Sequence, residues 1–298
     1  MNACGCKGIR TCALCRRGPW VKEDMPSCTY TLCPHCHVAY SNHHKCHDFV
    51  TGEEFSFNDV CLIDDFVNEQ EEAFLIESMS RNTWALSQSG RLKQDYGPKV
   101  NFKRQRVSVG RFTGLPDYSR FLVDRINDVI AKTPSLRQSV FYPVELCNLQ
   151  YCPDRGACIV PHLDDVWLWG DRLITLNLLS STVLTFTLPK METHESRAEL
   201  KRLVTELSSH TNVQMLNDVT VRVPLARRSL VIVDGPARNV WLHEIRAADI
   251  TDKRIAMTFR ELSSLFIAPP GKEAKTDEEI MGQKLQQIAS TYRGVVCS

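Results

Sequence analysis

The fold class is decided by the stretch LITLNLLSSTVLTFTL, residues 173–188. It holds two short runs, Leu173–Leu179 and Thr182–Leu188, which are rich in apolar and β-branched residues and therefore predict β-strands. Several short strands that end in turn residues favour a double-sheet jelly roll, or double-stranded β-helix, over a parallel sheet. Further runs of the same kind lie on either side: Val144–Tyr151, Val219–Val223, Ser229–Val233, Asn239–Ile245 and Arg254–Phe259.

Helices are predicted around this core, so the fold class is mostly β with flanking helices, an α+β arrangement. Asn68 follows a predicted strand at Val60–Val67 and caps a segment with apolar residues at roughly helical spacing. Arg81–Gly114 then lacks periodicity and is predicted to be a long loop or loose hairpin. The other helical patterns are Asp117–Lys132, Glu195–Ser209 (interpreted as an inserted surface helix) and Asp277–Tyr292.

Composition divides the chain into three parts. Residues 1–48 are dense in Cys and His and poor in branched apolar residues, so this segment cannot build a core unaided. Residues 49–268 hold the strand-rich domain, and residues 269–298 form a helical tail that begins with two prolines and a glycine. We therefore expect one main domain with a small N-terminal Cys/His-rich segment and a C-terminal helix.

Charge and hydropathy limit the possible partners. The 298 residues carry a formal net charge of +1, so no global field draws the chain toward nucleic acid or an anionic membrane. No run approaches the roughly 20 apolar residues of a membrane span, and the N-terminus shows no charged-then-apolar secretory pattern. We expect a monomer of the cytoplasm and nucleus with no membrane partner.

Candidate metal ligands occur in two distant places. His162 and Asp164 are two residues apart, so in a strand their side chains point to the same face and reach one metal. His243 ends the apolar run Asn239–Leu242, which would carry it to the core; the alternative is a core histidine bonded to backbone. Two imidazoles and one carboxylate leave three positions open on Fe(II), as binding of a 2-oxo acid and oxygen requires. These three residues are the predicted catalytic iron ligands.

Two arginines follow the last histidine. Arg254 and Arg260 are six residues apart in a predicted strand, so they share a face with the small residues Ala256 and Thr258 between them. Two buried guanidinium groups are costly without anions, and their forked geometry suits carboxylates. A dicarboxylate such as 2-oxoglutarate answers that cost, whereas the alternative is a pair of surface arginines on an edge strand.

These positions resemble the AlkB-type Fe(II)/2-oxoglutarate dioxygenases over about residues 57–268. The matching residues are Asn148-x-x-Tyr151, Gly156, Pro161-His162-Leu163-Asp164, Trp241-x-His243 and Arg254-x5-Arg260. The resemblance is closest to the subgroup called AlkB homologue four. The runs that carry it are Cys4–Cys12, Leu86–Arg91, Lys93–Phe102 and Asp164–Gly170.

The resemblance implies which side chains contact the cosubstrate. The contacts to 2-oxoglutarate correspond to Arg254, Arg260, Tyr151 and Asn148. The chain departs from the family at two points: the usual Asn-x-Tyr spacing is Asn148-x-x-Tyr151 here, and Ala256 replaces an asparagine that usually lies between the two arginines. The implied reaction hydroxylates an N-methyl group and releases succinate, carbon dioxide and formaldehyde.

The resemblance also implies a substrate class. For the subgroup it is methylated lysine in a protein, with actin suggested, and the alternative is N-methyladenine in DNA. In the family a substrate lid precedes the barrel, so residues 81–114 are the candidate lid. Between Arg91 and Arg106 it holds six basic residues against one acid, Asp95, which suits either a nucleic acid backbone or an acidic protein surface. Trp167 and Trp169 are candidates to wall the methyl pocket, or else core residues.

The N-terminal cysteines predict a second metal site. With thirteen cysteines and no secretory pattern, metal thiolates are a better interpretation than disulfides. Four thiolates within twelve residues complete a tetrahedral zinc site: Cys4, Cys6, Cys12 and Cys15. A further site near Cys33-Pro34-His35-Cys36 has too many competing ligands downstream to name four. Two alternatives remain: a zinc-bearing docking module without turnover, and a zinc hydrolase, which leaves the paired arginines unexplained.

Overall fold

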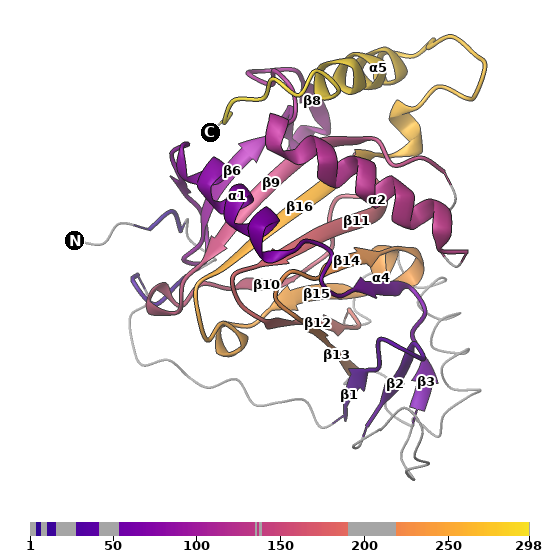
Figure 1. Ribbon diagram of the computed structural model, residues 1–298. Helices are drawn as coiled ribbons and strands as arrows, with labels where there is room; N and C mark the ends of the chain where they lie inside the picture. The colour runs from indigo at the N-terminus through magenta and orange to yellow at the C-terminus, as the bar shows by residue number, and fades with distance from the viewer. Residues whose placement is uncertain are drawn as a thin grey trace.

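The computed structural model describes residues 4–6, 11–15, 28–41, 54–134, 136, 139–189 and 219–297. Within them, two seven-stranded sheets face each other, which confirms the predicted jelly-roll class (Figure 1). The major sheet has the order β4 (Val60–Ile63), β14 (Leu230–Val233), β11 (Trp169–Leu178), β16 (Arg254–Leu262), β9 (Pro143–Tyr151), β6 (Leu92–Tyr96) and β5 (Ala85–Leu86).

The minor sheet covers the other side of the barrel. All its pairings are antiparallel except that β1 runs parallel to β13. Its order is β10 (Ile159–His162), β15 (Leu242–Ile245), β12 (Thr182–Thr187), β13 (Val219–Leu225), β1 (Cys28–Leu32), β2 (Val38–Tyr40) and β3 (Glu54–Ser56). Part of the Cys/His-rich segment thus extends a barrel sheet, while its separation as a region at residue 48 stays a prediction.

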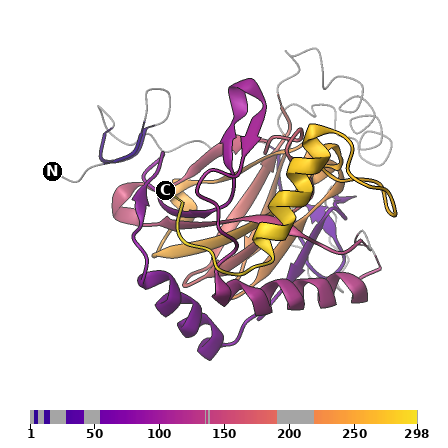
Figure 2. The same ribbon diagram turned by 90° about the horizontal axis from the view of Figure 1, so that it is seen from above.

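Helices cover the outer face of the major sheet (Figures 1 and 2). Asn68 caps the first of them with both bonds of a capping box, as its position in the sequence indicates. The helices on this face are α1 (Glu69–Ser80), α2 (Arg120–Lys132) and α5 (Asp277–Ala289), whereas the short α4 (Gly235–Asn239) packs Ala237 into the core between the sheets. Single-turn 3-10 segments are η1 (Phe102–Arg104), η2 (Asp117–Ser119), η3 (Pro153–Arg155), η5 (Ala247–Asp249) and η6 (Ser264–Phe266).

Alternation along the central strands creates two separate cores. In β16, Met257 and Phe259 pack beneath the helices, whereas Ala256 faces the space between the sheets. In β11, Ile174 joins the helix-side core and Leu173 the inter-sheet core. Each large side chain buried in this way contributes about 2 kcal/mol. The small residues of β16 face inward, so the pocket opens between the sheets.

Three segments differ from the sequence-based expectation. The predicted loop at 81–114 is more ordered: β5 and β6 extend the major sheet, and β7 (Lys99–Asn101) pairs with β8 (Arg106–Ser108) as a separate hairpin. The prediction of a strand from Asn239 was wrong at its start, because α4 ends there and Val240 and Trp241 both donate to the Pro236 carbonyl. The sequence analysis placed both His162 and Asp164 in a strand, but β10 ends at His162; Pro161 is tolerated within it because β10 lies at the edge of its sheet.

Two predicted helices remain to be compared with the structure. The predicted helix at Glu195–Ser209 lies outside the described residues. The C-terminal helix is present but ends three residues early, at Ala289. No helix in the described part of the chain is long and apolar enough to cross a bilayer.

Candidate metal centre and cosubstrate pocket

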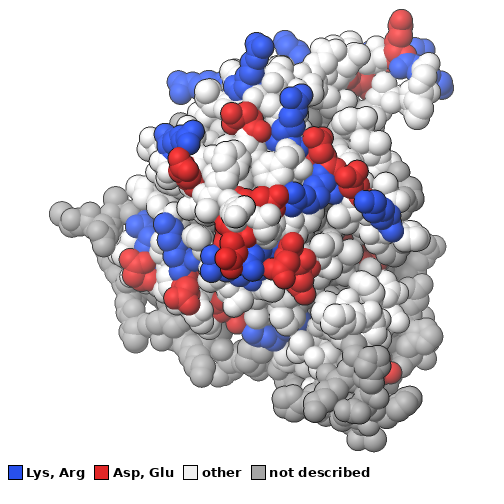
Figure 3. Space-filling model, in the orientation of Figure 1, with Lys and Arg blue, Asp and Glu red and all other residues white. Residues whose placement is uncertain are grey.

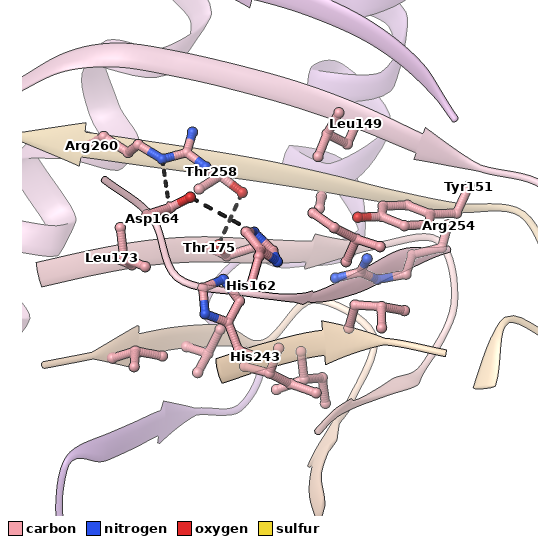
Figure 4. A pocket seen from close by; sticks show the side chains of 17 residues that line it. Leu149, Tyr151, His162, Asp164, Leu173, Thr175, His243, Arg254, Thr258 and Arg260 are labelled. Atoms are coloured by element: carbon pink, nitrogen blue, oxygen red, sulfur yellow. Dashed lines mark hydrogen bonds and ion pairs between the residues drawn. The ribbon is translucent and has the colours of Figure 1, made fainter. Parts of the chain in front are cut away.

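The two predicted histidines and the predicted aspartate meet at one end of the inter-sheet space. His162 ends β10 and lies opposite His243 of β15, and their ring centroids are 4.3 Å apart. Asp164 lies just after β10 rather than within it. The side-chain ligand atoms of all three residues lie within 4.8 Å of one another (Figure 4). The structure therefore brings together the residues predicted to bind iron.

The protonation states of this triad suit a metal. The Nδ1 atom of His162 lies 2.9 Å from the Val160 carbonyl, so Nδ1–H donates there and the Nε2 lone pair is left toward the centre. Burial, and then the neighbouring His162, lower the pKa of His243 to about 3, so this imidazole is neutral at pH 7. Burial opposes ionisation of Asp164, but Arg260 beside it brings the pKa of Asp164 below its usual range. Two neutral imidazoles and one carboxylate are the ligand set expected for Fe(II).

Arg260 connects the triad to a second buried carboxylate. Its Nε donates to Asp164 Oδ2 at 2.9 Å, and its Nη1 donates to Glu145 Oε2 at 2.6 Å. The side chains of all three residues are less than a fifth exposed. The ring of Trp169 lies below the guanidinium group, 5.8 Å from Cζ. In this arrangement Arg260 fixes the position of Asp164, and Glu145 holds Arg260. The sequence analysis did not identify Glu145 as part of the site.

Arg238 holds the loop that carries Asp164. This arginine of α4 is fully buried, and its Nη1 donates to the Asp164 carbonyl at 3.0 Å. Its Nη2 donates to the Trp169 carbonyl at 3.3 Å. Because this buried guanidinium group bonds both ends of the short loop from Asp164 to Trp169, it restricts where Asp164 can move. The sequence analysis missed this residue because its partners are backbone atoms some seventy positions away.

Arg254 lies at the far end of the pocket and is only partly satisfied. Its side chain is 2 % exposed, its Nε donates to Asn177 Oδ1 at 2.6 Å, and its Cζ lies 4.8 Å from the ring centre of Tyr151. Its Nη1 has no hydrogen-bond partner among the residues that the structure describes. Because an unpaired buried donor is costly, this nitrogen indicates that an anion belongs beside it. The carboxylate of 2-oxoglutarate fits that requirement.

Asn148 does not join the pocket. In β9, the side chains of Leu149 and Tyr151 face the space between the sheets, so Asn148 faces the helices. Its amide donates to Gln94 Oε1 at 3.2 Å and to the Tyr118 hydroxyl at 2.9 Å. Residues three apart in a strand lie on opposite faces, so the departure from Asn-x-Tyr spacing removes this asparagine from the cosubstrate. The prediction that Asn148 contacts 2-oxoglutarate is therefore wrong.

The space between the triad and Arg254 is lined by small and apolar side chains (Figure 4). The hydroxyls of Thr175 and Thr258 lie 3.0 Å apart on its wall. As predicted, Ala256 and Thr258 occupy the strand face between the two arginines and leave room for a ligand. The apolar lining residues are Leu149, Ile159, Leu173, Leu184, Leu225, Val231, Val233 and Ile245.

The four N-terminal cysteines also meet. Their Sγ atoms all lie within 4.8 Å of one another, and those of Cys12 and Cys15 are 3.8 Å apart. Two sulfurs bound tetrahedrally to one zinc ion lie about 3.8 Å apart, so this spacing fits zinc. Of the residues proposed for a second site, Cys33 is buried and Cys36 exposed, while the downstream ligands lie outside the described residues.

The two-sheet barrel, the facial triad and the pocket with a buried arginine define a class of protein, the 2-oxoglutarate-dependent Fe(II) dioxygenases. No family model matches the sequence. Over 303 residues the chain is 42 % identical to alpha-ketoglutarate-dependent dioxygenase alkB homolog 4 of Homo sapiens, with 99 % of this chain and 95 % of the relative covered. The Mus musculus protein of the same name is 40 % identical over 303 residues, with 99 % and 96 % covered.

A third relative carries a different description. The DNA N6-methyl adenine demethylase of Caenorhabditis elegans is 30 % identical over 287 residues, with 89 % of this chain and 88 % of that protein covered. The chain therefore belongs to the AlkB family of dioxygenases, among the relatives named alkB homolog 4. Its cofactors are Fe(II) and 2-oxoglutarate, and it is an enzyme of the 2-oxoglutarate-dependent dioxygenase class.

Proposed function

We propose that this protein is an oxidative N-demethylase whose iron ligands are His162, Asp164 and His243. The observation that carries the proposal is the pocket in which this triad faces Arg254, a buried guanidinium group with one nitrogen that has no partner among the residues described. A zinc hydrolase on the same triad offers no reason for that second end of the pocket. A docking module without turnover offers no reason for either end.

The side chains of the pocket have separate tasks in this proposal. Arg254 and Tyr151 bind one carboxylate of 2-oxoglutarate, and Asn177 orients Arg254. Arg260 holds Asp164 in place, and the apolar walls exclude water from the reacting groups. When bound there, Fe(II) and 2-oxoglutarate would supply the oxidation of an N-methyl group by oxygen, with release of succinate and carbon dioxide. The hydroxymethyl amine that results loses formaldehyde to leave the free amine.

The substrate we propose is a methylated lysine in a protein. Exposed apolar side chains surround the iron ligands in sequence: Val160 is 37 %, Leu163 36 % and Val166 57 % exposed. Exposed apolar side chains so close in sequence to the iron ligands suit a folded polypeptide partner better than a phosphate backbone. On the face that carries α1 and α2, acidic and basic side chains are intermixed (Figure 3). Actin is the protein suggested by the resemblance to the homologue-four subgroup.

DNA methyladenine is the second candidate substrate, and one feature favours it. Four basic residues of the β7–β8 hairpin are exposed: Lys99, Lys103, Arg104 and Arg106. The tip of the hairpin lies beside Trp167, close in sequence to the iron ligand Asp164. The Caenorhabditis elegans relative is described as a DNA N6-methyl adenine demethylase. A basic hairpin at this place would neutralise phosphates, with binding that weakens steeply as salt rises.

Formaldehyde release distinguishes the two substrates. Iron-loaded protein is given 2-oxoglutarate, oxygen and either a methyl-lysine protein or a methyladenine oligonucleotide, at low and moderate salt. The proposal expects formaldehyde from the methyl-lysine substrate and none from the oligonucleotide, with His162→Ala inactive and the exposed-surface control Arg81→Ala active. Formaldehyde from the oligonucleotide alone, lost at higher salt and in a hairpin variant with Lys103 and Arg104 changed to Ala, would establish the DNA substrate.

A further inference from the structure

The four-cysteine cluster is seated against two loops of the dioxygenase domain. Ala13 donates its N–H to the Arg155 carbonyl at 3.2 Å, and the backbone of Gly90 and Ser89 is hydrogen-bonded to the Cys6 thiol. The two loops are themselves joined, because Cys158 donates to the Ser89 carbonyl at 3.0 Å. The four-cysteine cluster, the turn at 87–91 and the loop at 155–158 therefore form one contact region.

Two glycines make this close seating possible. A Cβ atom on Gly5, between Cys4 and Cys6, would lie 2.8 Å from the Ser87 carbonyl oxygen. A Cβ atom on Gly90 would lie 2.6 Å from the Arg155 carbonyl oxygen, and the φ of +75° at Gly90 is one that side chains rarely adopt. Backbone packed this closely against backbone leaves no room for a side chain. The contact is therefore specific to these residues.

One of the two loops leads directly into the catalytic pocket. The turn at 87–91 does not line the pocket, but Cys158 of the other loop donates its N–H to the Ser89 carbonyl of this turn. The loop at 155–158 continues into β10, whose Ile159 lines the pocket and whose last residue is His162. Arg155 links the two by donating from Nε to the Gly90 carbonyl at 2.8 Å. Movement of the four-cysteine cluster would thus displace the predicted metal ligand His162.

We propose that zinc held by Cys4, Cys6, Cys12 and Cys15 fastens the 87–91 turn to β10 and thereby positions His162 at the pocket. The cluster is then a brace for the active site rather than an independent docking module. This inference rests on the proposed function only in that His162 belongs to the catalytic pocket. Thiolate sites that accept backbone N–H bonds are held more rigidly than bare sites, as the contacts to Cys6 provide here.

Zinc content and backbone hydrogen exchange test the brace without relying on turnover. The full chain is compared as wild type, Cys15→Ser, which changes an exposed ligand, and Cys297→Ser, a half-buried cysteine outside the cluster. We expect one zinc per chain in the wild type and in Cys297→Ser, and loss of zinc in Cys15→Ser. Peptides that include the Ser87 and Cys158 amides should then exchange about tenfold faster in Cys15→Ser, with other barrel peptides unchanged.

A second variant separates zinc binding from docking. Gly5→Ala keeps all four thiolates but places a methyl group against the Ser87 carbonyl. We expect it to retain zinc, to exchange faster at the same two peptides, and to bind Fe(II) severalfold more weakly, because the contact leads to the iron ligand His162, with little change in the affinity for 2-oxoglutarate. A general loss of folding would speed exchange throughout the barrel, so faster exchange at these two peptides alone would distinguish a lost contact from unfolding.

The possible failures are distinguishable. A zinc-free Cys15→Ser protein with wild-type exchange at both peptides would overturn the brace, as would a wild-type protein that contains no zinc. Unchanged exchange in Gly5→Ala would show that the docking contact is wrong. Faster exchange in both variants of a protein that never releases formaldehyde would leave the brace standing and refute the proposed function instead.

Discussion

The two arginines of β16 lie on one strand face, six residues apart, yet their surroundings are opposite. Arg260 donates to two carboxylates, and these raise its pKa although burial alone would lower it. Among the described residues no carboxylate lies beside Arg254, and burial lowers its pKa. One arginine is thus satisfied by the chain itself, and the other retains a donor without a partner in the described part of the chain. A shared residue type and strand face therefore do not imply a shared role: Arg260 holds the predicted metal ligand Asp164, and Arg254 is the residue that we propose binds the cosubstrate. The predicted contact of Arg260 with 2-oxoglutarate stays a prediction.

Removal of Arg260 should have the largest effect. In Arg260→Met, Asp164 and Glu145 are left as two unpaired buried carboxylates, so we expect a loss of about 3–5 kcal/mol in the free energy of unfolding. Urea denaturation measures this loss, with Arg81→Ala as the exposed control. A variant as stable as the control would show that Arg260 does not neutralise these carboxylates.

Removal of Arg254 should affect binding without lowering stability. Arg254→Met deletes a buried charge whose Nη1 has no partner within the described ranges, so we expect the free energy of unfolding to stay the same or to rise by about 1 kcal/mol. The affinity for 2-oxoglutarate should fall roughly 100-fold, because its carboxylate loses a buried charged partner. Calorimetric titration in the presence of Fe(II) measures that affinity. Equal destabilisation of Arg254→Met and Arg260→Met would erase the distinction between the two residues.

A smaller change tests how Arg260 is held. Glu145→Gln preserves the size of the side chain but removes the charge that Arg260 Nη1 contacts. We expect iron affinity to fall about tenfold, since the partner of a ligand-orienting residue is altered, with little change in 2-oxoglutarate affinity. Equilibrium titration with Fe(II) under nitrogen provides the measurement. Glu145→Ala should be worse than Glu145→Gln, and the reverse order would contradict this role.

The smallest effect concerns the support of Arg254. Asn177 accepts from Arg254 Nε and donates to the carbonyls of Ser180 and Ala226. Asn177→Ala should raise the KM for 2-oxoglutarate about five- to tenfold, the size expected when a charged group loses one hydrogen bond. Steady-state kinetics at varied 2-oxoglutarate measures the shift. A change in iron affinity with an unchanged KM would contradict the role of Asn177 as a support of Arg254.

The strands and the triad could be predicted because their signals are local. β-Branched runs such as Thr182–Leu188 indicate strands regardless of what they contact, and β12 does begin at Thr182. The two-residue spacing of His162 and Asp164 still puts both on the metal side, although Asp164 lies beyond the end of β10. The placement of Asn148 could have been predicted in the same way, because an odd spacing from Tyr151 fixes it on the other face.

The supporting residues could not be found from local patterns. Glu145, Asn177 and Arg238 act through partners that are distant in the sequence, and nothing in their own neighbourhoods marks them as parts of a site. The β6 strand was missed for a related reason. Its sequence, LKQDY, alternates without a strongly apolar face, and its pairing with β9 supplies the stability that its composition does not indicate.

Succinate formation at two concentrations of 2-oxoglutarate tests the central claim most directly. Wild type, Arg254→Met and Arg81→Ala are loaded with Fe(II) and supplied with oxygen and a saturating N-methyl substrate. We predict that the wild type and the control form succinate at low 2-oxoglutarate, while Arg254→Met does so only when the concentration is raised about 100-fold. Wild-type rates from Arg254→Met at low 2-oxoglutarate, or no iron-dependent succinate from the wild type, would contradict the assignment of this pocket.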